Sequence, residues 1–130
     1  MTGLLQEQRP PGREVIVGVS EAAGLGSLVM FGLGGVFVEV MKDVTFRLHP
    51  LTDRDADEMV RGVRGYALLD GYRGAPPADV PALEETLLRV SALVGNHPEI
   101  VEMDLNPVKV LALGKGCVAV DARIRLGVRP

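Results

Sequence analysis

The sequence has a single cysteine and no long hydrophobic run, and both features limit what the protein can be. Cys117 cannot form an intramolecular disulfide, and no second cysteine is present to share a thiolate metal site. No apolar run reaches the roughly 18 to 20 residues that span a bilayer, and the N-terminus lacks the basic and then apolar profile of a signal peptide. We therefore expect a cytoplasmic protein with no membrane partner.

Basic residues are not in excess either. The chain has 14 Lys and Arg against 17 Asp and Glu, which gives a net charge of −3. A protein that binds nucleic acid mainly through phosphate contacts needs a basic surface, so the composition argues against a nucleic-acid partner. Hydrophobic residues make up 47% of the 130 residues, which is enough for one buried core. We expect residues 1–130 to form a single domain.

The first part of the chain has the composition of β-structure. Arg13–Val19 is rich in β-branched residues and lies between two turn-like segments, which predicts a strand. Three further antiparallel strands are expected at about 27–32, 35–41 and 44–48. The glycines between them could also suggest a phosphate-binding loop, but no Lys-Ser or Lys-Thr follows and no helix begins there. A tight turn between strands is the better interpretation.

Two helices are predicted in the second half. Thr52 with Asp55 three residues later is typical of an N-cap, and the helix that begins there should run to about Arg64. Asp79 should cap a longer helix that ends near His97. The apolar positions of that helix recur at steps of three and four residues, so they lie on one face. These positions are Leu83, Leu87, Val90 and Val94.

The last two strands complete the expected fold. Glu99–Val110 and Gly116–Arg125 are predicted strands, and the glycines between them suit a tight hairpin. The element order is several strands, two helices and two strands. That order predicts an α+β fold, a mostly antiparallel sheet with helices packed on one face.

Oxygen-bearing side chains gather on these last two strands. Asp104 and Asn106 are two residues apart, so on a strand they point to the same face. If the following strand turns back antiparallel, Asp121 comes opposite them. Carboxylate and amide oxygens are suitable ligands for Mg²⁺ on a nucleotide phosphate. The alternative is a set of exposed polar positions on a half-solvated sheet, and spacing alone leaves both interpretations open.

Asp121 bears on that choice. Strict alternation within "CVAVDARI" places Cys117, Ala119 and Asp121 on one face, where we expect the acid to be close to the buried side of the sheet. An unpaired buried charge costs several kcal/mol, so Asp121 would need a partner. Arg123 on the same face, or a metal ion, could provide it.

Two further residues are candidates for contacting a cofactor. Glu39 lies between Val38 and Val40 in a predicted strand, although an outward-facing glutamate is the commoner case. Arg47 could reach a phosphate or pair with an acid. Both residues are retained as candidate nucleotide-binding side chains.

Five segments in this order resemble the C-terminal lobe of the ATP-grasp domain in ADP-forming acyl-CoA synthetases. They are "GREVIVGV", "VMFGLGGVFVEVMKDVTFRLHPLT", "LLDGYRGAPPADVPALEETLLRVS", "VEMDLNPVKV" and "VAVDARI". The resemblance is chiefly to the acetyl-CoA synthetase (ADP-forming) beta chain, runs from about Gly3 to Leu126, and extends more distantly to the succinyl-CoA synthetase beta chain.

The resemblance implies a role in nucleotide chemistry. Asn106 and Asp121 match the Mg²⁺ ligands of such enzymes, with Asp104 beside them as a third ligand or as a residue that supports the ligands. The implied cofactors are Mg²⁺ and ATP or ADP. The implied reaction converts acyl-CoA, ADP and phosphate to the acid, CoA and ATP through a phosphohistidine.

The resemblance also implies missing parts. The family's preceding lobe, with its phosphate-binding lysine and histidine segment, does not match any part of this sequence, and neither do the CoA-binding domains. We therefore expect an excised piece, a remnant or a split subunit that does not turn over alone and that needs this lobe and these domains as partners. Exposed apolar surface could also lead to homo-oligomers. The alternative is a non-catalytic assembly or regulatory module that retains the lobe fold.

Overall fold

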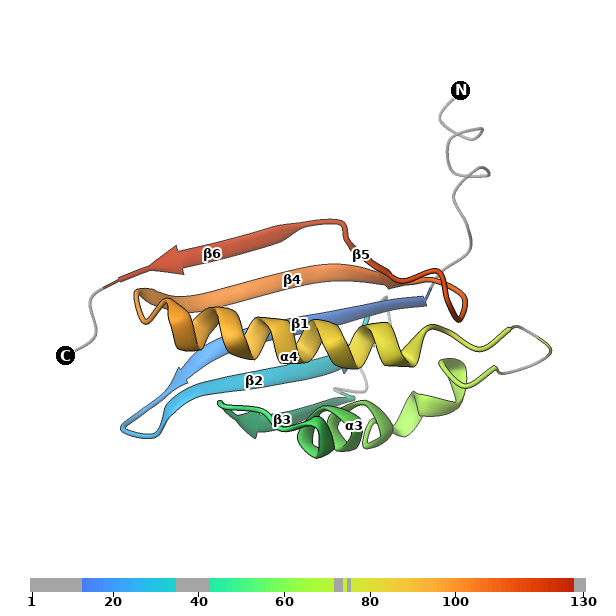
Figure 1. The fold of residues 1–130 in the computed structure, drawn as a ribbon, viewed down its shortest axis with the longest axis horizontal. Helices are drawn as coiled ribbons and strands as arrows, with labels where there is room; N and C mark the ends of the chain where they lie inside the picture. Colours follow the sequence, from blue (N-terminus) through green and yellow to red (C-terminus); the bar gives the residue numbers. More distant parts are fainter. Residues whose placement is uncertain (1–12, 35–42, 72–73, 75, 128–130) are drawn as a thin grey trace, which may run out of the picture.

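The computed structural model describes residues 13–34, 43–71, 74 and 76–127. Within them, six strands form one sheet in which all pairings are antiparallel. The strands are β1 (Arg13–Ala22), β2 (Gly26–Leu33), β3 (Val44–Leu48), β4 (Ile100–Val110), β5 (Cys117–Ala119) and β6 (Ala122–Leu126). Their order is β3-β2-β1-β4-β5 (Figure 1). β6 also pairs with β4, along the first part of that strand, whereas β5 pairs with its last part. The predicted strand at 35–41 lies outside the described residues.

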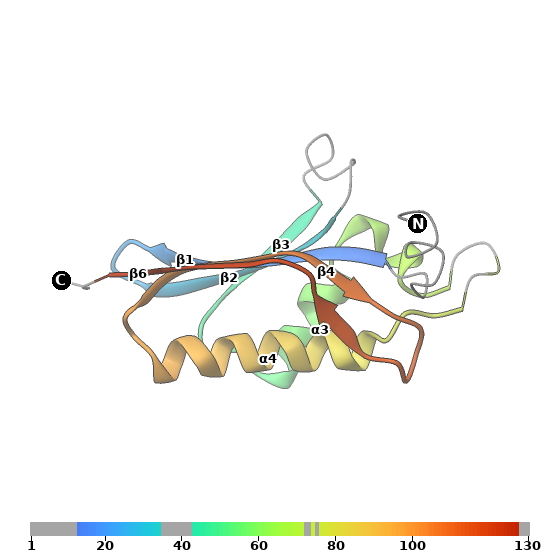
Figure 2. The same ribbon diagram turned by 90° about the horizontal axis from the view of Figure 1, so that it is seen from above.

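The α-helices α3 (Asp53–Arg61) and α4 (Val80–Asn96) cover one face of this sheet, and among the described residues no α-helix lies on the other face (Figure 2). The predicted α+β fold with helices on one side is therefore confirmed. β1 contributes Val15, Val17 and Val19 to the core, and every second residue faces the helices because strand side chains alternate. We call the face opposite these two α-helices the open face. Among the described residues, no helix is long and apolar enough to cross a membrane.

The cap of α3 forms as predicted. Thr52 Oγ1 accepts a hydrogen bond from Asp55 N at 3.1 Å, and the Asp55 carboxylate accepts one from Thr52 N at 2.8 Å, which completes a capping box. The predicted end at Arg64 is wrong, because α3 ends at Arg61. Asp43 provides the physical reason.

Asp43 holds the start of the next helical turn, the 3-10 helix η1 (Arg64–Leu68). Its carboxylate accepts hydrogen bonds from Arg64 N at 2.6 Å and from Gly65 N at 2.8 Å. These N–H groups donate to a side chain 21 and 22 residues away. They therefore do not donate to the backbone carbonyl groups of α3, as a continued α-helix would require. A distant carboxylate thus separates α3 from η1.

Asp79 caps α4 as predicted, and the four predicted apolar positions are buried. Its Oδ1 accepts from Ala82 N at 3.2 Å, while its Oδ2 accepts from Gly114 N at 3.1 Å and Gly116 N at 2.8 Å. Both glycines have positive φ angles, of 87° and 90°, which the tight β4–β5 hairpin requires. One buried carboxylate therefore joins the start of α4 to the hairpin.

The strand predicted at Gly116–Arg125 is interrupted. It forms β5 and β6, with Val120 and Asp121 between them. Cys117 packs against the core on the helix side, whereas Asp121 is exposed. The prediction that these two residues share a face is therefore wrong, because the break between β5 and β6 shifts the alternation by one residue.

Candidate metal and nucleotide site

Asn106 of β4 is the direct neighbour of Asp121, the residue that immediately precedes β6. The backbone N–H of Asn106 donates to the carbonyl oxygen of Asp121 at 3.2 Å. The adjoining register pairs Leu105 with Ala122 and Asp104 with Arg123, so the next pair along the two strands is Asn106 with Asp121. The predicted antiparallel return is present at this point of the sheet.

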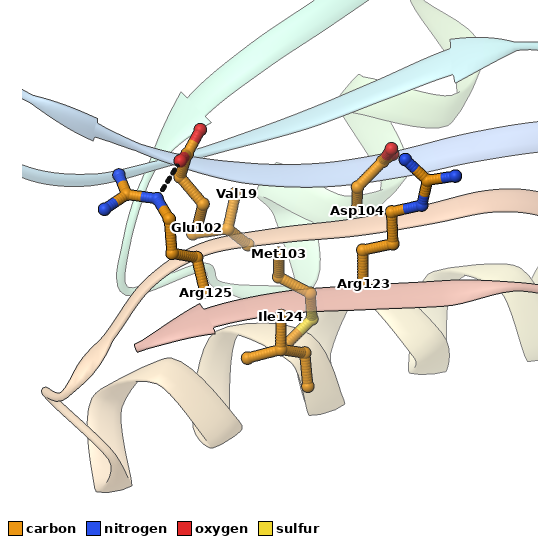
Figure 3. A pocket seen from close by; sticks show the side chains of 7 residues that line it. All are labelled: Val19, Glu102, Met103, Asp104, Arg123, Ile124 and Arg125. Carbon is orange, nitrogen blue, oxygen red and sulfur yellow. Dashed lines mark hydrogen bonds and ion pairs between the residues drawn. The ribbon is translucent and has the colours of Figure 1, made fainter. Parts of the chain in front are cut away.

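These side chains belong to the open face. Met103 is buried under the helices, and the next residue, Asp104, is exposed on the opposite side of the sheet. Figure 3 shows Asp104 and Arg123 rising from the sheet on the same side, while Met103 and Ile124 point the other way. Asn106 and Asp121 are exposed as well.

Strand β4 contains a bulge at Asn106 and its neighbours. In the pairing with β1, Val15 lies opposite Val108 and Val17 lies opposite Leu105, so β4 contains one more residue than β1 over this stretch. The Asn106–Pro107 peptide bond is cis. The bulge explains why Met103 and Val108, which are an odd number of positions apart, both face the core.

The chemistry of this group suits a hard divalent cation. Asn106 offers an amide oxygen and Asp121 a carboxylate, with the Asp104 carboxylate one two-residue step away along β4. In the described ranges, no group of three or more His, Cys, Asp and Glu side chains could hold a metal. Because the side chains are exposed, a cation here would complete its shell with water or phosphate oxygens, as Mg²⁺ commonly does.

The expectation that Asp121 is buried and needs a partner is wrong. Its side chain is exposed to water, so its charge carries no burial cost. Arg123 is two residues further along the chain than Asp121 and lies directly opposite Asp104 of β4. The next arginine on β6, Arg125, is hydrogen-bonded to the carboxylate of Glu102 through its Nε. A shallow hollow of about 220 Å³ is lined partly by Glu102, Asp104, Arg123 and Arg125 (Figure 3).

Arg47 is not brought to this group. On β3 it lies opposite Val29, which is fully buried beneath the helices. Its NH1 donates to Phe46 O at 2.8 Å, and its NH2 is 3.5 Å from Glu58 Oε1 on α3. Arg47 therefore lies on the helix side of the sheet. Glu39, the other candidate nucleotide contact, lies outside the described residues.

The open face also has an apolar part that the sequence analysis did not identify. Phe46 of β3 pairs with Met30 of β2, which in turn pairs with Gly18 of β1. Phe46 is 46% exposed although it is apolar. The Met30 methyl carbon lies so close over β1 that a Cβ on Gly18 would be 3.3 Å from it. The alternation of "VTFRL" could have placed Phe46 opposite the helix side.

The register connects the two parts of the open face. Phe46, Met30, Gly18, Asp104 and Arg123 are paired in turn across five strands. One line across the sheet therefore runs from an exposed aromatic ring to an aspartate and an arginine. A ligand with an apolar ring system at one end and an anionic group at the other would match this polarity.

Together these features define an α+β lobe whose open face carries clustered oxygen-bearing side chains beside an apolar area. Residues 2–126 match the ATP-grasp domain family, and the chain belongs to that family.

Two curated relatives describe the similarity further. The chain is 51% identical over 124 residues to the acetate–CoA ligase (ADP-forming) II subunit beta of Pyrococcus furiosus, covering 95% of this chain and 52% of that subunit. It is 57% identical over 125 residues to acetate–CoA ligase (ADP-forming) II of Archaeoglobus fulgidus, covering 96% of this chain and 18% of that ligase. The chain thus spans about half of the subunit and less than a fifth of the longer ligase.

A solved structure has the same fold. The dinucleotide-forming acetyl-coenzyme A synthetase 1 of Candidatus Korarchaeum cryptofilum, in complex with coenzyme A and Mg-AMPPCP, superposes with a TM-score of 0.85 at 46% identity. The match covers 92% of this chain and 55% of that one. In that complex a phosphohistidine segment points towards the nucleotide-binding site.

Proposed function

We propose that this chain is the nucleotide- and Mg²⁺-binding lobe of an ADP-forming acyl-CoA synthetase, of the acetyl-CoA synthetase type. In this role it takes part in phosphoryl transfer between ATP or ADP and a phosphohistidine. The observation that carries the proposal is the backbone hydrogen bond that places Asp121, just before β6, beside Asn106 of β4.

The residues have distinct roles in this proposal. The amide oxygen of Asn106 and the carboxylate of Asp121 hold Mg²⁺, and Asp104 binds it directly or through water. When bound, Mg²⁺ neutralises charge on the nucleotide's phosphates. The chain's own residues position the phosphates on the open face. Phe46 and Met30 offer the apolar area against which the base packs.

The remaining parts of the reaction belong to other segments or subunits. The chain spans 52% of the Pyrococcus furiosus subunit and 55% of the Korarchaeum chain, so each of these proteins has further residues that this chain does not match. We infer that a second ATP-grasp lobe and CoA-binding domains act with this chain. We further propose that the chain alone does not turn over.

A second candidate function, a non-catalytic assembly or regulatory module, is favoured by one observation. Ile124 and Leu126 on β6 are 53% and 64% exposed and line a hollow of about 420 Å³ together with Leu93 and Ile100. An exposed apolar area of this kind is typical of surfaces that contact another protein. The two functions differ in whether Mg²⁺-dependent nucleotide binding occurs.

Calorimetry with Mg-ADP separates them. The chain is titrated alone and fused to the half of the Pyrococcus furiosus subunit that it does not match. Asn106→Ala and Asp121→Ala are expected to remove the Mg²⁺-dependent part of the binding heat. Glu85→Gln, which changes an exposed acid on α4, serves as the control and should bind as the unchanged chain does. Absence of binding in both forms of the unchanged chain would favour the non-catalytic module.

A further inference from the structure

Arg123 and Arg125 are a natural pair for comparison. Both are on β6, both are exposed, and both lie on the open face opposite an acid of β4, Asp104 and Glu102 respectively. Arg125 is bonded to its opposite acid through Nε. An ion pair has a nitrogen and a carboxylate oxygen no more than 4.0 Å apart. Among the described residues, no carboxylate oxygen comes this close to a guanidinium nitrogen of Arg123. The Arg125 guanidinium is therefore engaged within the protein, while that of Arg123 is available.

The two arginines also differ in their distance from the Asn106–Asp121 pair. Residues on an antiparallel strand advance by about 3.4 Å each, so Arg123 lies about 7 Å along β6 from Asp121 and Arg125 about 14 Å. A Mg²⁺ ion keeps its oxygen ligands at about 2.1 Å. Phosphate oxygens on such an ion are therefore within reach of the long Arg123 side chain. Arg125 is too far along the strand.

The local charge favours a cation at this position. Asp104 and Asp121 are both acids on the open face, and each repels a nucleotide phosphate when no cation lies between them. A guanidinium is always charged and can donate two parallel hydrogen bonds to a phosphate. Asp104, directly across the sheet from Arg123, attracts the guanidinium towards the β4 side.

We propose that Arg123 binds the terminal phosphate of the nucleotide, and that Asp104 orients its guanidinium towards that phosphate. The inference rests on the proposed function, because the phosphate is placed there by the cation at Asn106 and Asp121. It adds to that site a second contact with the nucleotide phosphate, made by the guanidinium of Arg123. Arg123 selects the phosphate end of the nucleotide, and Arg125 does not contribute.

The test uses the fused chain described above and four titrations. Mg-ADP binding is measured by calorimetry for the unchanged chain, Arg123→Gln, Arg123→Lys and Arg125→Gln. Arg123→Gln is expected to weaken Mg-ADP binding roughly tenfold to a hundredfold, the usual effect of removing a charged hydrogen bond. Arg123→Lys should recover part of the loss, and Arg125→Gln should bind within about twofold of the unchanged chain.

A second measurement separates phosphate contact from damage to the cation site. Mn²⁺ binding without nucleotide is followed by electron paramagnetic resonance, and Arg123→Gln should bind Mn²⁺ at least as tightly as the unchanged chain. Equal losses for Arg123→Gln and Arg125→Gln, or a parallel loss of Mn²⁺ binding, would overturn this inference while leaving the proposed function intact. No Mg-ADP binding by the unchanged fusion would overturn both.

Discussion

Asp79 Oδ2 accepts a 2.8 Å hydrogen bond from the backbone N–H of Gly116, a residue 37 positions further along the chain. The same carboxylate caps α4 and is buried. It therefore connects the start of a helix to the hairpin that leads into β5 and towards Asp121.

Asp79→Ala should destabilise the fold strongly. The substitution leaves the N–H groups of Ala82, Gly114 and Gly116 without this acceptor, and we expect the free energy of unfolding to fall by about 2–4 kcal/mol. Urea unfolding followed by circular dichroism measures the change. Thr52→Ala, which removes an exposed cap from α3, should cost only about 1 kcal/mol. A loss for Asp79→Ala no greater than this would contradict the linking role.

Cys117 should react slowly with alkylating reagents in the folded protein. Burial raises the pKa of its thiol from 9.0 to about 11, with a smaller contribution from the charge of Asp79. Only the thiolate reacts, so at pH 8 the folded protein has about a hundredfold less thiolate than a thiol with a pKa of 9. Iodoacetamide labelling followed by mass spectrometry gives the rate between pH 7 and 10. A rate in native buffer equal to that in 6 M urea would contradict the prediction.

Glu84 should make stability depend on pH. Burial, and then the neighbouring Asp57, raise the pKa of the Glu84 carboxyl in the folded state. A raised pKa means that the native state holds the proton more tightly, so the contribution of Glu84 is complete below its unfolded pKa and is lost as pH rises through the folded pKa. Relative to the unchanged protein, Glu84→Gln should therefore be more stable at pH 7 than at pH 4 in urea unfolding.

Asp57, on the adjoining helix α3, should make stability depend on pH in the opposite direction. The hydrogen bond from Arg61 lowers the pKa of the Asp57 carboxyl, so its contribution is present above the unfolded pKa and is lost as pH falls. Relative to the unchanged protein, Asp57→Asn should be less stable at pH 7 than at pH 3. The same pH trend for Glu84→Gln and Asp57→Asn would show that the interaction between the two acids is misassigned.

Phe46→Ala should affect nucleotide binding more than stability. The ring is 46% exposed on the open face, so its removal leaves little cavity in the core, and we expect a loss of stability below about 1.5 kcal/mol. If the base packs on this area, Mg-ADP affinity should fall severalfold in the calorimetry described above. Leu126→Ala, which removes an exposed apolar side chain from the far end of β6, is the control and should bind unchanged.

The local features of the chain were predictable from the sequence. The caps at Thr52 and Asp79 form as expected, because a cap needs only a side chain and the N–H groups two or three residues later. The buried face of α4 was predictable for the same reason, since 3.6-residue periodicity is a local property. The glycine hairpin before β5 belongs to this group as well.

The features that depend on distant contacts were not predictable. The end of α3 at Arg61 depends on Asp43, whose carboxylate holds the N–H groups of Arg64 and Gly65. Arg47 lies on the helix side of the sheet because it pairs with Val29, a buried residue of another strand. Neither dependence can be seen in a window of neighbouring residues.

By itself, the sequence determined that a strand bearing Asp104 and Asn106 is followed by an antiparallel return that carries Asp121, because alternation and hairpin glycines are encoded locally. Only the tertiary structure decided which face they share. The break between β5 and β6 and the bulge in β4 shift the side-chain alternation, and their positions follow from pairing with β1 and β4 across the whole sheet.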